Sequence, residues 1–159
     1  MKCGDWWCVV PLTGTFTRSI DQKLRVAIPK RLREALNCPI RGVLYVAPGT
    51  DGSLAIYSEE AFGHLAERLA QASPTRQQVR DFTRLFYGQA QQVELDGQGR
   101  IRLPKHLVAL ARLHKEVVLL GVQDHLELWG ADRWEAYLED RQGRYDEIAE
   151  AAFDGPRPP

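Results

Sequence analysis

A short segment of this chain occurs twice, and this internal repeat constrains the fold more than any other feature of the sequence. Residues 21–32 read DQKLRVAIPKRL, and residues 96–107 read DGQGRIRLPKHL. Without a gap, the two segments share an aspartate, an arginine, a proline, a lysine and a leucine, and they agree in apolar character at two further positions. A repeat of this kind predicts two copies of one structural unit.

The expected secondary structure is duplicated as well. In each copy, the apolar pattern predicts a strand, a turn, a second strand, a short helix, two further strands and a longer helix. Pro29 and Pro104 stand where the short helices are expected to begin, a position that tolerates proline well. The apolar segments 42–48 and 116–122 predict buried strands at the same relative place. The sequence therefore predicts an α/β (α+β) fold made of two equivalent halves.

Helix signals outside the repeat divide the chain further. Ser58, followed by two glutamates, is typical of a helix start, and Gly88 is typical of a helix end. One long helix is expected after Trp129. We predict the following organisation: an N-terminal extension at 1–11, a first copy at 12–62, connecting helices at 63–88, a second copy at 89–134, a C-terminal helix at 135–153 and a disordered tail at 154–159.

Composition places the chain among soluble globular proteins, with 44% hydrophobic and 26% charged residues. No apolar run approaches the roughly 20 residues that a membrane span needs. The first residues carry one lysine and a very short apolar stretch, so we expect no secretory signal. The three cysteines are an odd number, which fits reduced thiols in a cytoplasm better than a disulfide framework.

The net charge is zero, but the charges are unevenly distributed. Residues 16–33 hold six cations and one anion, whereas residues 124–154 hold ten anions and three cations. Both segments could simply be solvated faces. The asymmetry also allows an anionic partner to bind at the basic end of the molecule.

The first turn of the repeat departs from the second at one position. The second copy reads DGQGR, with the glycines that a tight turn with positive φ requires, whereas the first copy reads DQKLR. Leu24 stands where the second copy has Gly99. A left-handed leucine would cost roughly 1–2 kcal/mol. The first turn therefore either has a different shape or is strained.

These residues resemble the MraZ family of bacterial transcriptional regulators, which belongs to the AbrB-like swapped-hairpin barrel superfamily. The resemblance covers about residues 12–153 and rests on the twin turns, on LTGTFTRSID at 12–21 and on EVVLLGVQDHLELWGADRWEAYLE at 116–139. It implies tandem duplicated half-barrels that form one pseudo-two-fold barrel, with helices between the copies and a C-terminal helix. Leu24 departs from the family pattern, which has glycine there.

The resemblance also implies a function. Members of the family bind double-stranded DNA at tandem repeats upstream of their own operon, the division and cell-wall gene cluster, and act mainly as repressors. Their chains associate in rings, so the resemblance implies a homo-oligomer. Binding to DNA implies a location in the cytoplasm, in association with the nucleoid. The DNA-contacting motif of the family falls here on Asp21, Lys23 and Arg25, and Arg100 stands at the equivalent place in the second copy.

Basic side chains near the twin turns are the candidate DNA contacts. They are Arg18, Lys23, Arg25, Lys30, Arg100 and Arg102. An arginine can form bidentate bonds with a guanine edge, and a lysine supplies a point charge for phosphates. A ring would repeat such weak contacts along tandem DNA sites. Alternatively, Asp21 and Asp96 only cap their turns, and Arg25 and Arg100 pair with these aspartates.

No pattern in the sequence predicts an enzyme, a metal site or a cofactor. The four histidines show no ligand spacing, Cys3 and Cys8 lack a second pair, and DGQGR is not a phosphate-binding glycine motif. Tyr57, Trp129 and Trp134 are expected in the core or at subunit contacts rather than in base stacking.

Three other interpretations remain open beside the DNA-binding regulator. The first is an oligomeric protein-interaction scaffold whose DNA-reading turn has decayed at Leu24. The second is an enzyme with an unrecognised site, which a buried polar cleft would support. The third is a non-specific nucleic-acid binder, which would bind scrambled DNA equally well.

Overall fold

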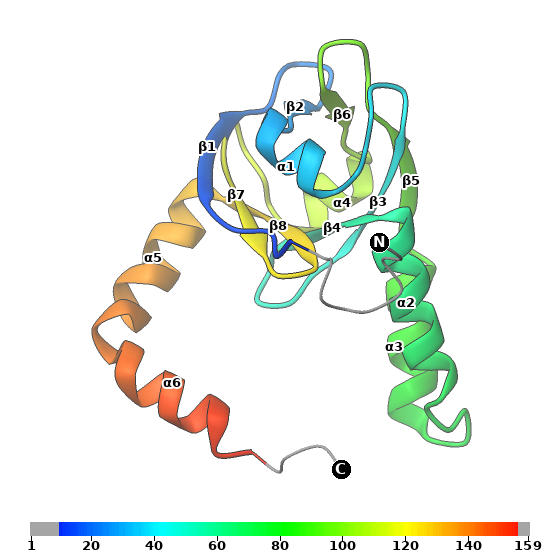
Figure 1. Cartoon of the computed structure of the whole chain (residues 1–159), viewed down its shortest axis with the longest axis vertical. Helices are drawn as coiled ribbons and strands as arrows, with labels where there is room; N and C mark the ends of the chain where they lie inside the picture. Colours follow the sequence, from blue (N-terminus) through cyan, green and yellow to red (C-terminus); the bar gives the residue numbers. More distant parts are fainter. Residues whose placement is uncertain (1–9, 156–159) are drawn as a thin grey trace, which may run out of the picture.

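The computed structural model describes residues 10–155 and shows a mixed α/β fold (Figure 1). Six strands form an antiparallel sheet in the order β1-β7-β8-β4-β3-β5, and β2 pairs with β6 in a separate two-stranded ribbon. The strands are β1 (Thr15–Ser19), β2 (Arg25–Ala27), β3 (Val43–Pro48), β4 (Leu54–Ser58), β5 (Gln91–Glu94), β6 (Arg100–Arg102), β7 (Glu116–Val122) and β8 (His125–Gly130). The predicted α/β class is confirmed.

The helices follow the duplicated order. They are α1 (Lys30–Ala35), α2 (Glu59–Ala70), α3 (Gln77–Tyr87), α4 (Lys105–Leu110), α5 (Ala131–Arg141) and α6 (Tyr145–Phe153), with a short 3-10 helix, η2 (Gln142–Arg144), between the last two. The Ser58 hydroxyl accepts the backbone N–H of Ala61 and caps α2, as the sequence predicts. None of the helices within residues 10–155 combines the length and apolar content needed to cross a bilayer.

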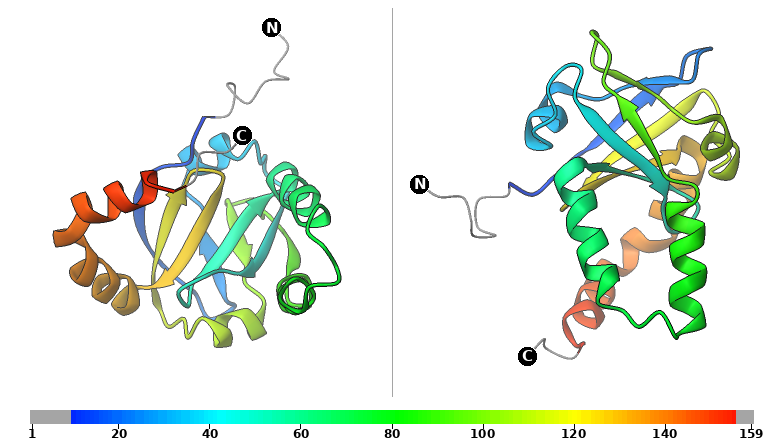
Figure 2. Two further views of the ribbon diagram at one scale, coloured as in Figure 1. Left: turned by 90° about the horizontal axis from the view of Figure 1, so that it is seen from below. Right: turned by 90° about the vertical axis from the view of Figure 1, so that its right-hand side faces the viewer.

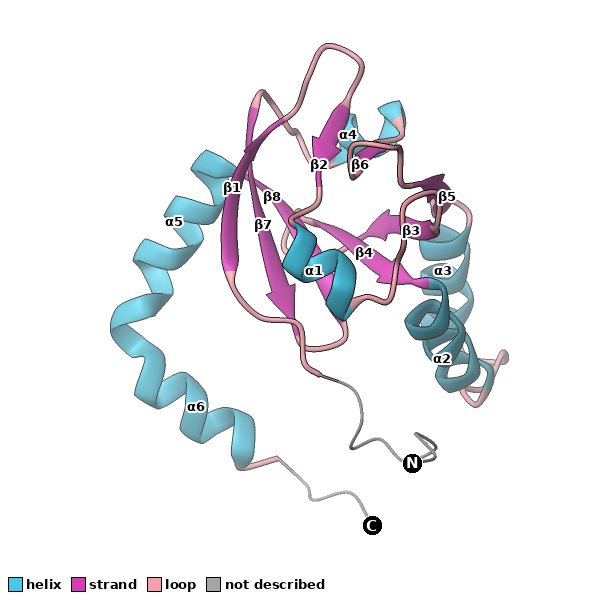
Figure 3. Cartoon of the chain, turned by 45° about the horizontal axis from the view of Figure 1, so that its top comes forward, coloured by secondary structure: helices cyan, strands magenta, loops and turns pink. Residues whose placement is uncertain are grey.

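The strands of the two copies are interleaved. At one edge, β1 of the first copy pairs with β7 of the second, and at the other edge β5 of the second copy pairs with β3 of the first. The central pair, β4 with β8, and the ribbon pair, β2 with β6, also join one copy to the other (Figure 3). Neither copy therefore completes its own sheet, which ties the two halves into one folding unit.

One hydrophobic core lies between the sheet and the ribbon. It takes fully buried side chains from both layers and from the two short helices: Val26, Leu32, Leu44, Ile101, Leu107, Leu119 and Leu128. Full burial of such side chains stabilises the fold by about 1.5–3 kcal/mol each. The same packing fixes the ribbon, and with it the turns at its ends, against the sheet.

The longer helices pack on the sheet through aromatic contacts. Trp134 of α5 meets Trp129 of β8 with ring centroids 5.4 Å apart, and Phe62 of α2 lies 5.9 Å from Tyr57 of β4. These contacts support the expected structural role of the aromatic residues. The pair α2 and α3 and the pair α5 and α6 project as two arms from one end of the molecule, and the turns of the ribbon lie at the other (Figures 1 and 2).

The prediction of one long helix after Trp129 is wrong. The helix breaks at η2, and the chain bends there before α6 begins (Figure 1). Gly143 lies within the break, and glycine costs a helix interior about 1 kcal/mol relative to alanine. The predicted boundaries after residues 62 and 134 fall inside α2 and α5, because both helices begin directly after their strands.

Some of the predicted parts lie partly outside the described residues. These are residues 1–9 of the expected N-terminal extension, with Cys3 and Cys8, and residues 156–159 of the expected tail. Cys38 is a buried free thiol, and desolvation raises its pKa.

Candidate nucleic-acid interface

The turn between β1 and β2 is organised by the side chain of Asp21. Its Oδ1 accepts the backbone N–H groups of Lys23 and Arg25, each at 2.9 Å, and its carbonyl oxygen accepts the N–H of Leu24 at 3.0 Å. The N–H of Arg25 is the main reason that the pKa of Asp21 lies below its usual value of 3.8. Asp21 is therefore a turn cap, one of the two roles that its sequence allows.

The turn between β5 and β6 repeats this arrangement. Asp96 Oδ1 accepts the N–H groups of Gln98 and Arg100 at 2.9 Å, and its carbonyl oxygen accepts the N–H of Gly99 at 3.0 Å. The N–H of Arg100 is the main cause of a lowered pKa at Asp96. The repeat in the sequence is thus a repeat of one hydrogen-bonded turn.

Leu24 does not change the shape of the first turn. Its φ is +60°, and that of Gly99 is +75°, so both residues lie in the left-handed region. Of the two possibilities left open by the sequence, strain is the correct one, at a cost of roughly 1–2 kcal/mol for a residue with a Cβ. The first turn has kept its geometry despite the missing glycine.

The ribbon presents arginines on its outer face. Val26 and Ile101 are direct partners across the ribbon, and both are fully buried in the core. Because neighbouring residues of a strand point to opposite faces, the flanking positions face outward. Arg25 pairs there with Arg102, and Ala27 pairs with Arg100. Three of the predicted site residues, taken from both copies, therefore lie on one surface.

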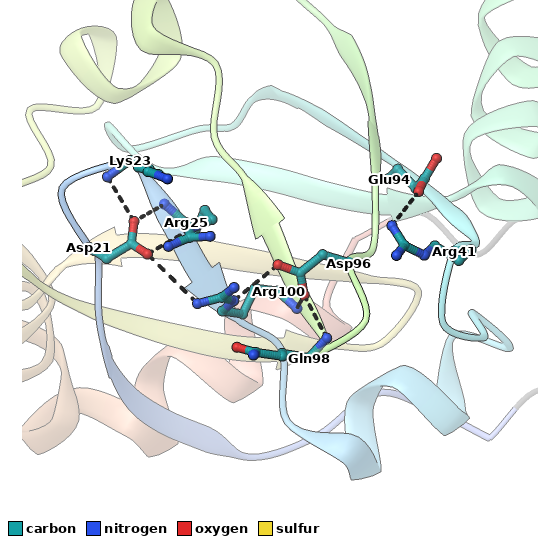
Figure 4. Close-up of polar contacts among 8 residues, drawn as sticks. All are labelled: Asp21, Lys23, Arg25, Arg41, Glu94, Asp96, Gln98 and Arg100. Carbon is teal, nitrogen blue, oxygen red and sulfur yellow. Dashed lines mark hydrogen bonds and ion pairs between the residues drawn. The ribbon is translucent and has the colours of Figure 1, made fainter.

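Ion pairs connect the two turns (Figure 4). Arg25 Nε lies 2.7 Å from Asp21 Oδ2, Arg100 Nε lies 3.0 Å from Asp96 Oδ2, and Arg100 Nη1 lies 3.9 Å from Asp21 Oδ2. The expected alternative, in which the arginines pair with the aspartates, is therefore present in the structure. A guanidinium has five N–H donors, so these pairs orient the arginines and leave donors for another acceptor.

Lys23 joins this face, but Arg18 and Lys30 lie off the ribbon. Lys23 is exposed in the first turn. Arg18 lies on β1, where its guanidinium is 5.7 Å from the ring centroid of Phe16 and donates to the carbonyl oxygen of Thr17. Lys30 begins α1, and its Nζ lies 3.9 Å from a carboxylate oxygen of Glu34. The predicted set is thus divided into ribbon residues and peripheral ones.

Two arginines beside the second turn were not predicted as site residues. A Cβ placed on Gly99 would lie 2.9 Å from Cζ of Arg33, and one placed on Gly97 would lie 3.9 Å from Nη2 of Arg41. Arg41 also forms an ion pair with Glu94 at 3.3 Å. Both arginines belong to the first copy but flank the turn of the second. No local sequence signal reveals this, because it follows from the interleaving of the strands.

In the rest of the described chain, the polar side chains show no comparable arrangement. Among residues 10–155, no group of three or more His, Cys, Asp or Glu side chains is placed to hold a metal ion. His125 is half-buried between Asp124 and Glu127, and its hydrogen bond with Glu127 is the main cause of its raised pKa. This cluster lies at the β7–β8 turn rather than on the ribbon.

The fold and the ribbon face define a class: duplicated α/β proteins that present paired arginine-bearing turns on one surface. The family model of the MraZ protein, described as antitoxin-like, matches residues 12–85 and again residues 86–155. The chain belongs to the MraZ family.

Several curated proteins named transcriptional regulator MraZ are similar over most of their length. The protein of Alkaliphilus metalliredigens is 38% identical over 136 residues, which cover 86% of this chain and 92% of that protein. The protein of Ligilactobacillus salivarius is 37% identical over 89% of this chain and 96% of its own length. The protein of Moorella thermoacetica is 39% identical over the same two shares, 89% and 96%.

Proposed function

We propose that this chain is a sequence-specific DNA-binding transcriptional regulator that binds double-stranded DNA through the outer face of the β2–β6 ribbon. The observation that carries the proposal is the direct pairing of Arg25 with Arg102 across the ribbon. Like charges in directly opposed positions destabilise a sheet, and an anionic partner would offset their repulsion. The names of the relatives, transcriptional regulator MraZ, support the same function.

Each basic side chain of this face has a role that fits its position. Arg25 and Arg100 are oriented by the aspartates and suit bidentate bonds to guanine edges in the major groove. Lys23 and Arg102 are exposed and suit contacts with phosphates. Arg18 and Lys30, which lie off the ribbon, contribute peripheral charge only. The acidic helices α5 and α6 project from the end of the molecule opposite the ribbon turns (Figure 1), away from the proposed DNA.

The interleaved strands and the family support a finer description of the fold. We infer a tandem AbrB-like swapped-hairpin barrel, in which each copy, 12–62 and 89–134, contributes half. A homo-oligomeric ring would repeat the ribbon face at a fixed spacing, and several weak contacts along tandem promoter repeats would then add through effective concentration. On this proposal the protein is a cytoplasmic, nucleoid-associated repressor of its own gene and of the division and cell-wall cluster. It needs no cofactor and has no enzymatic activity.

Fluorescence anisotropy tests the proposal directly. The purified protein is titrated with labelled DNA from upstream of its own gene and with a scrambled duplex, across a salt series. We expect a clear preference for the upstream DNA and an affinity that falls steeply as salt rises, because phosphate contacts release counterions.

The alternative functions give different results in the same experiment. Equal affinity for both duplexes would mark a non-specific nucleic-acid binder. No binding to either duplex, in a protein that still assembles, would favour the interaction scaffold. The intact geometry of the first turn argues against the scaffold, since that interpretation depends on decay of the turn at Leu24.

A further inference from the structure

Each turn of the ribbon is anchored on the opposite copy. The carbonyl oxygen of Leu24 accepts the N–H of Leu103 at 2.7 Å, and the carbonyl oxygen of Gly99 accepts the N–H of Ile28 at 2.9 Å. Leu103 and Ile28 lie in the segments that lead into α4 and α1. The first turn therefore lies against the segment before α4, and the second turn lies against the segment before α1.

In the second turn, the absence of a side chain at Gly99 makes room for an arginine. A Cβ at this buried position would lie only 2.9 Å from Cζ and 3.1 Å from Nε of Arg33. Arg33 Nε donates to the carbonyl oxygen of Ile28 at 3.1 Å, so the guanidinium is held in place. A side chain at position 99 would therefore displace the guanidinium of Arg33 from this place.

The first turn shows the opposite combination. Position 24 carries a leucine, and the repeat places Val108 of α4 at the position equivalent to Arg33 of α1. Leu24 and Val108 are both partly buried, and both pack against the main core. The first turn therefore has two apolar residues where the second turn has a glycine and an arginine.

We propose that Leu24 packs against Val108 and is a positioning residue for Lys23 and Arg25. A leucine disfavours the left-handed backbone that the turn requires, and partial burial of its side chain against the core would offset that cost. Beside the capping aspartates, apolar packing supports the first turn, and the guanidinium of Arg33 occupies the equivalent place beside the second turn. The positioning of Lys23 and Arg25 for DNA rests on the proposed DNA-binding function, whereas the packing of Leu24 on Val108 does not.

A double-mutant cycle tests this pair. The variants are Leu24→Gly, Val108→Arg and the double variant, which recreates the glycine–arginine pair of the second turn. Affinity is measured for upstream and scrambled DNA, and unfolding by urea is measured without DNA. The reciprocal cycle, Gly99→Leu with Arg33→Val, is the matched control.

The two single variants should each weaken binding to upstream DNA by about tenfold, or about 1.4 kcal/mol. Their preference for upstream DNA over scrambled DNA should fall. The salt dependence of the affinity should stay the same, because the number of phosphate contacts is unchanged. A purely structural role would leave the preference of the folded protein unaltered. The double variant should recover most of the affinity and most of the resistance to urea.

If the effects of Leu24→Gly and Val108→Arg simply add in the double variant, both for DNA affinity and for unfolding, the proposed contact between Leu24 and Val108 is wrong. An unchanged DNA preference in Leu24→Gly would overturn the positioning role. If the wild-type protein shows no preference for upstream DNA, the proposed function fails and the positioning role fails with it. The coupling measured in unfolding would then still decide whether Leu24 packs on Val108.

Discussion

The two turns of the ribbon share a backbone but not the residues that hold it. Asp21 and Asp96 accept the N–H groups of the equivalent residues of their own turns, at the same distances. Leu24 nevertheless stands in the first turn where the second has Gly99. The comparison teaches that the capping carboxylate defines this turn more strictly than the glycine does. A larger residue, here the partly buried Leu24, can fill the left-handed position of this turn.

The helices that follow the two copies differ more than the turns do. The equivalent aromatic pairs, Tyr57 with Phe62 and Trp129 with Trp134, dock α2 and α5 on the sheet in the same way. Beyond these contacts, α2 turns back into α3, whereas α5 bends through η2 into α6. The duplicated part ends where the helices leave the sheet, and the arms have diverged.

The largest expected effect concerns the core beneath the ribbon. Ile101→Ala should lower the free energy of unfolding by about 2–5 kcal/mol, because Ile101 is fully buried and its removal leaves a cavity. Val26→Ala removes fewer atoms from the matching position of the first copy and should cost less. Urea denaturation followed by circular dichroism measures both. A larger loss for Val26→Ala would contradict equal packing of the two halves.

Acid should weaken both turns through their capping aspartates. The folded-state pKa values of Asp21 and Asp96 lie below 3.8, so their contribution to stability is present above pH 3.8 and is lost as the pH falls through the lowered values. Asp21→Asn should lower the free energy of unfolding more than Asp96→Asn does, since Asp21 contacts both Arg25 and Arg100. Unfolding by urea between about pH 5 and pH 2 tests this order. Equal losses would show that the contact at 3.9 Å contributes nothing.

The stability of the β7–β8 hairpin should depend on pH, and that of the equivalent β3–β4 hairpin should not. His125 has a raised pKa, mainly through Glu127, and the repeat places the neutral Ser53 at its position in the first copy. The stability that His125 contributes is fully present below its ordinary pKa of 6.5 and is lost as the pH rises through the raised value. In the wild type the melting temperature should fall as the pH rises from about 6 to about 9, and His125→Gln should remove most of this fall. A wild-type midpoint that rises over this range would oppose the prediction.

The smallest effect is expected at the equivalent lysines that begin α1 and α4. Lys30 is exposed and lies 3.9 Å from Glu34, an i,i+4 pair that is worth at most about 0.5 kcal/mol. Lys30→Ala and the control Lys105→Ala should both leave unfolding nearly unchanged. A clear loss in Lys30→Ala alone would assign the first helix a structural ion pair that the second lacks.

The sequence was sufficient to predict the duplicated elements and the capping role of Asp21, because both depend on local patterns. It also named Arg25, Arg100 and Arg102 as candidate DNA contacts, and the structure brings these three onto one face of the ribbon. It could not place Arg33 and Arg41 beside the second turn, since these approaches depend on strand pairing between residues far apart in the chain. The break at η2 was missed because the apolar pattern continues on both sides of Gly143.

The central claim is that arginines from both copies form one DNA-binding face. The direct test is anisotropy with upstream DNA for Arg25→Ala, Arg100→Ala and the control Arg84→Ala, whose arginine is exposed on the α3 arm. Arg25→Ala and Arg100→Ala should each weaken specific binding by about 1–3 kcal/mol, with smaller losses on scrambled DNA, and Arg84→Ala should bind as the wild type does. Unchanged affinity in both ribbon variants, with their folding intact, would contradict the claim.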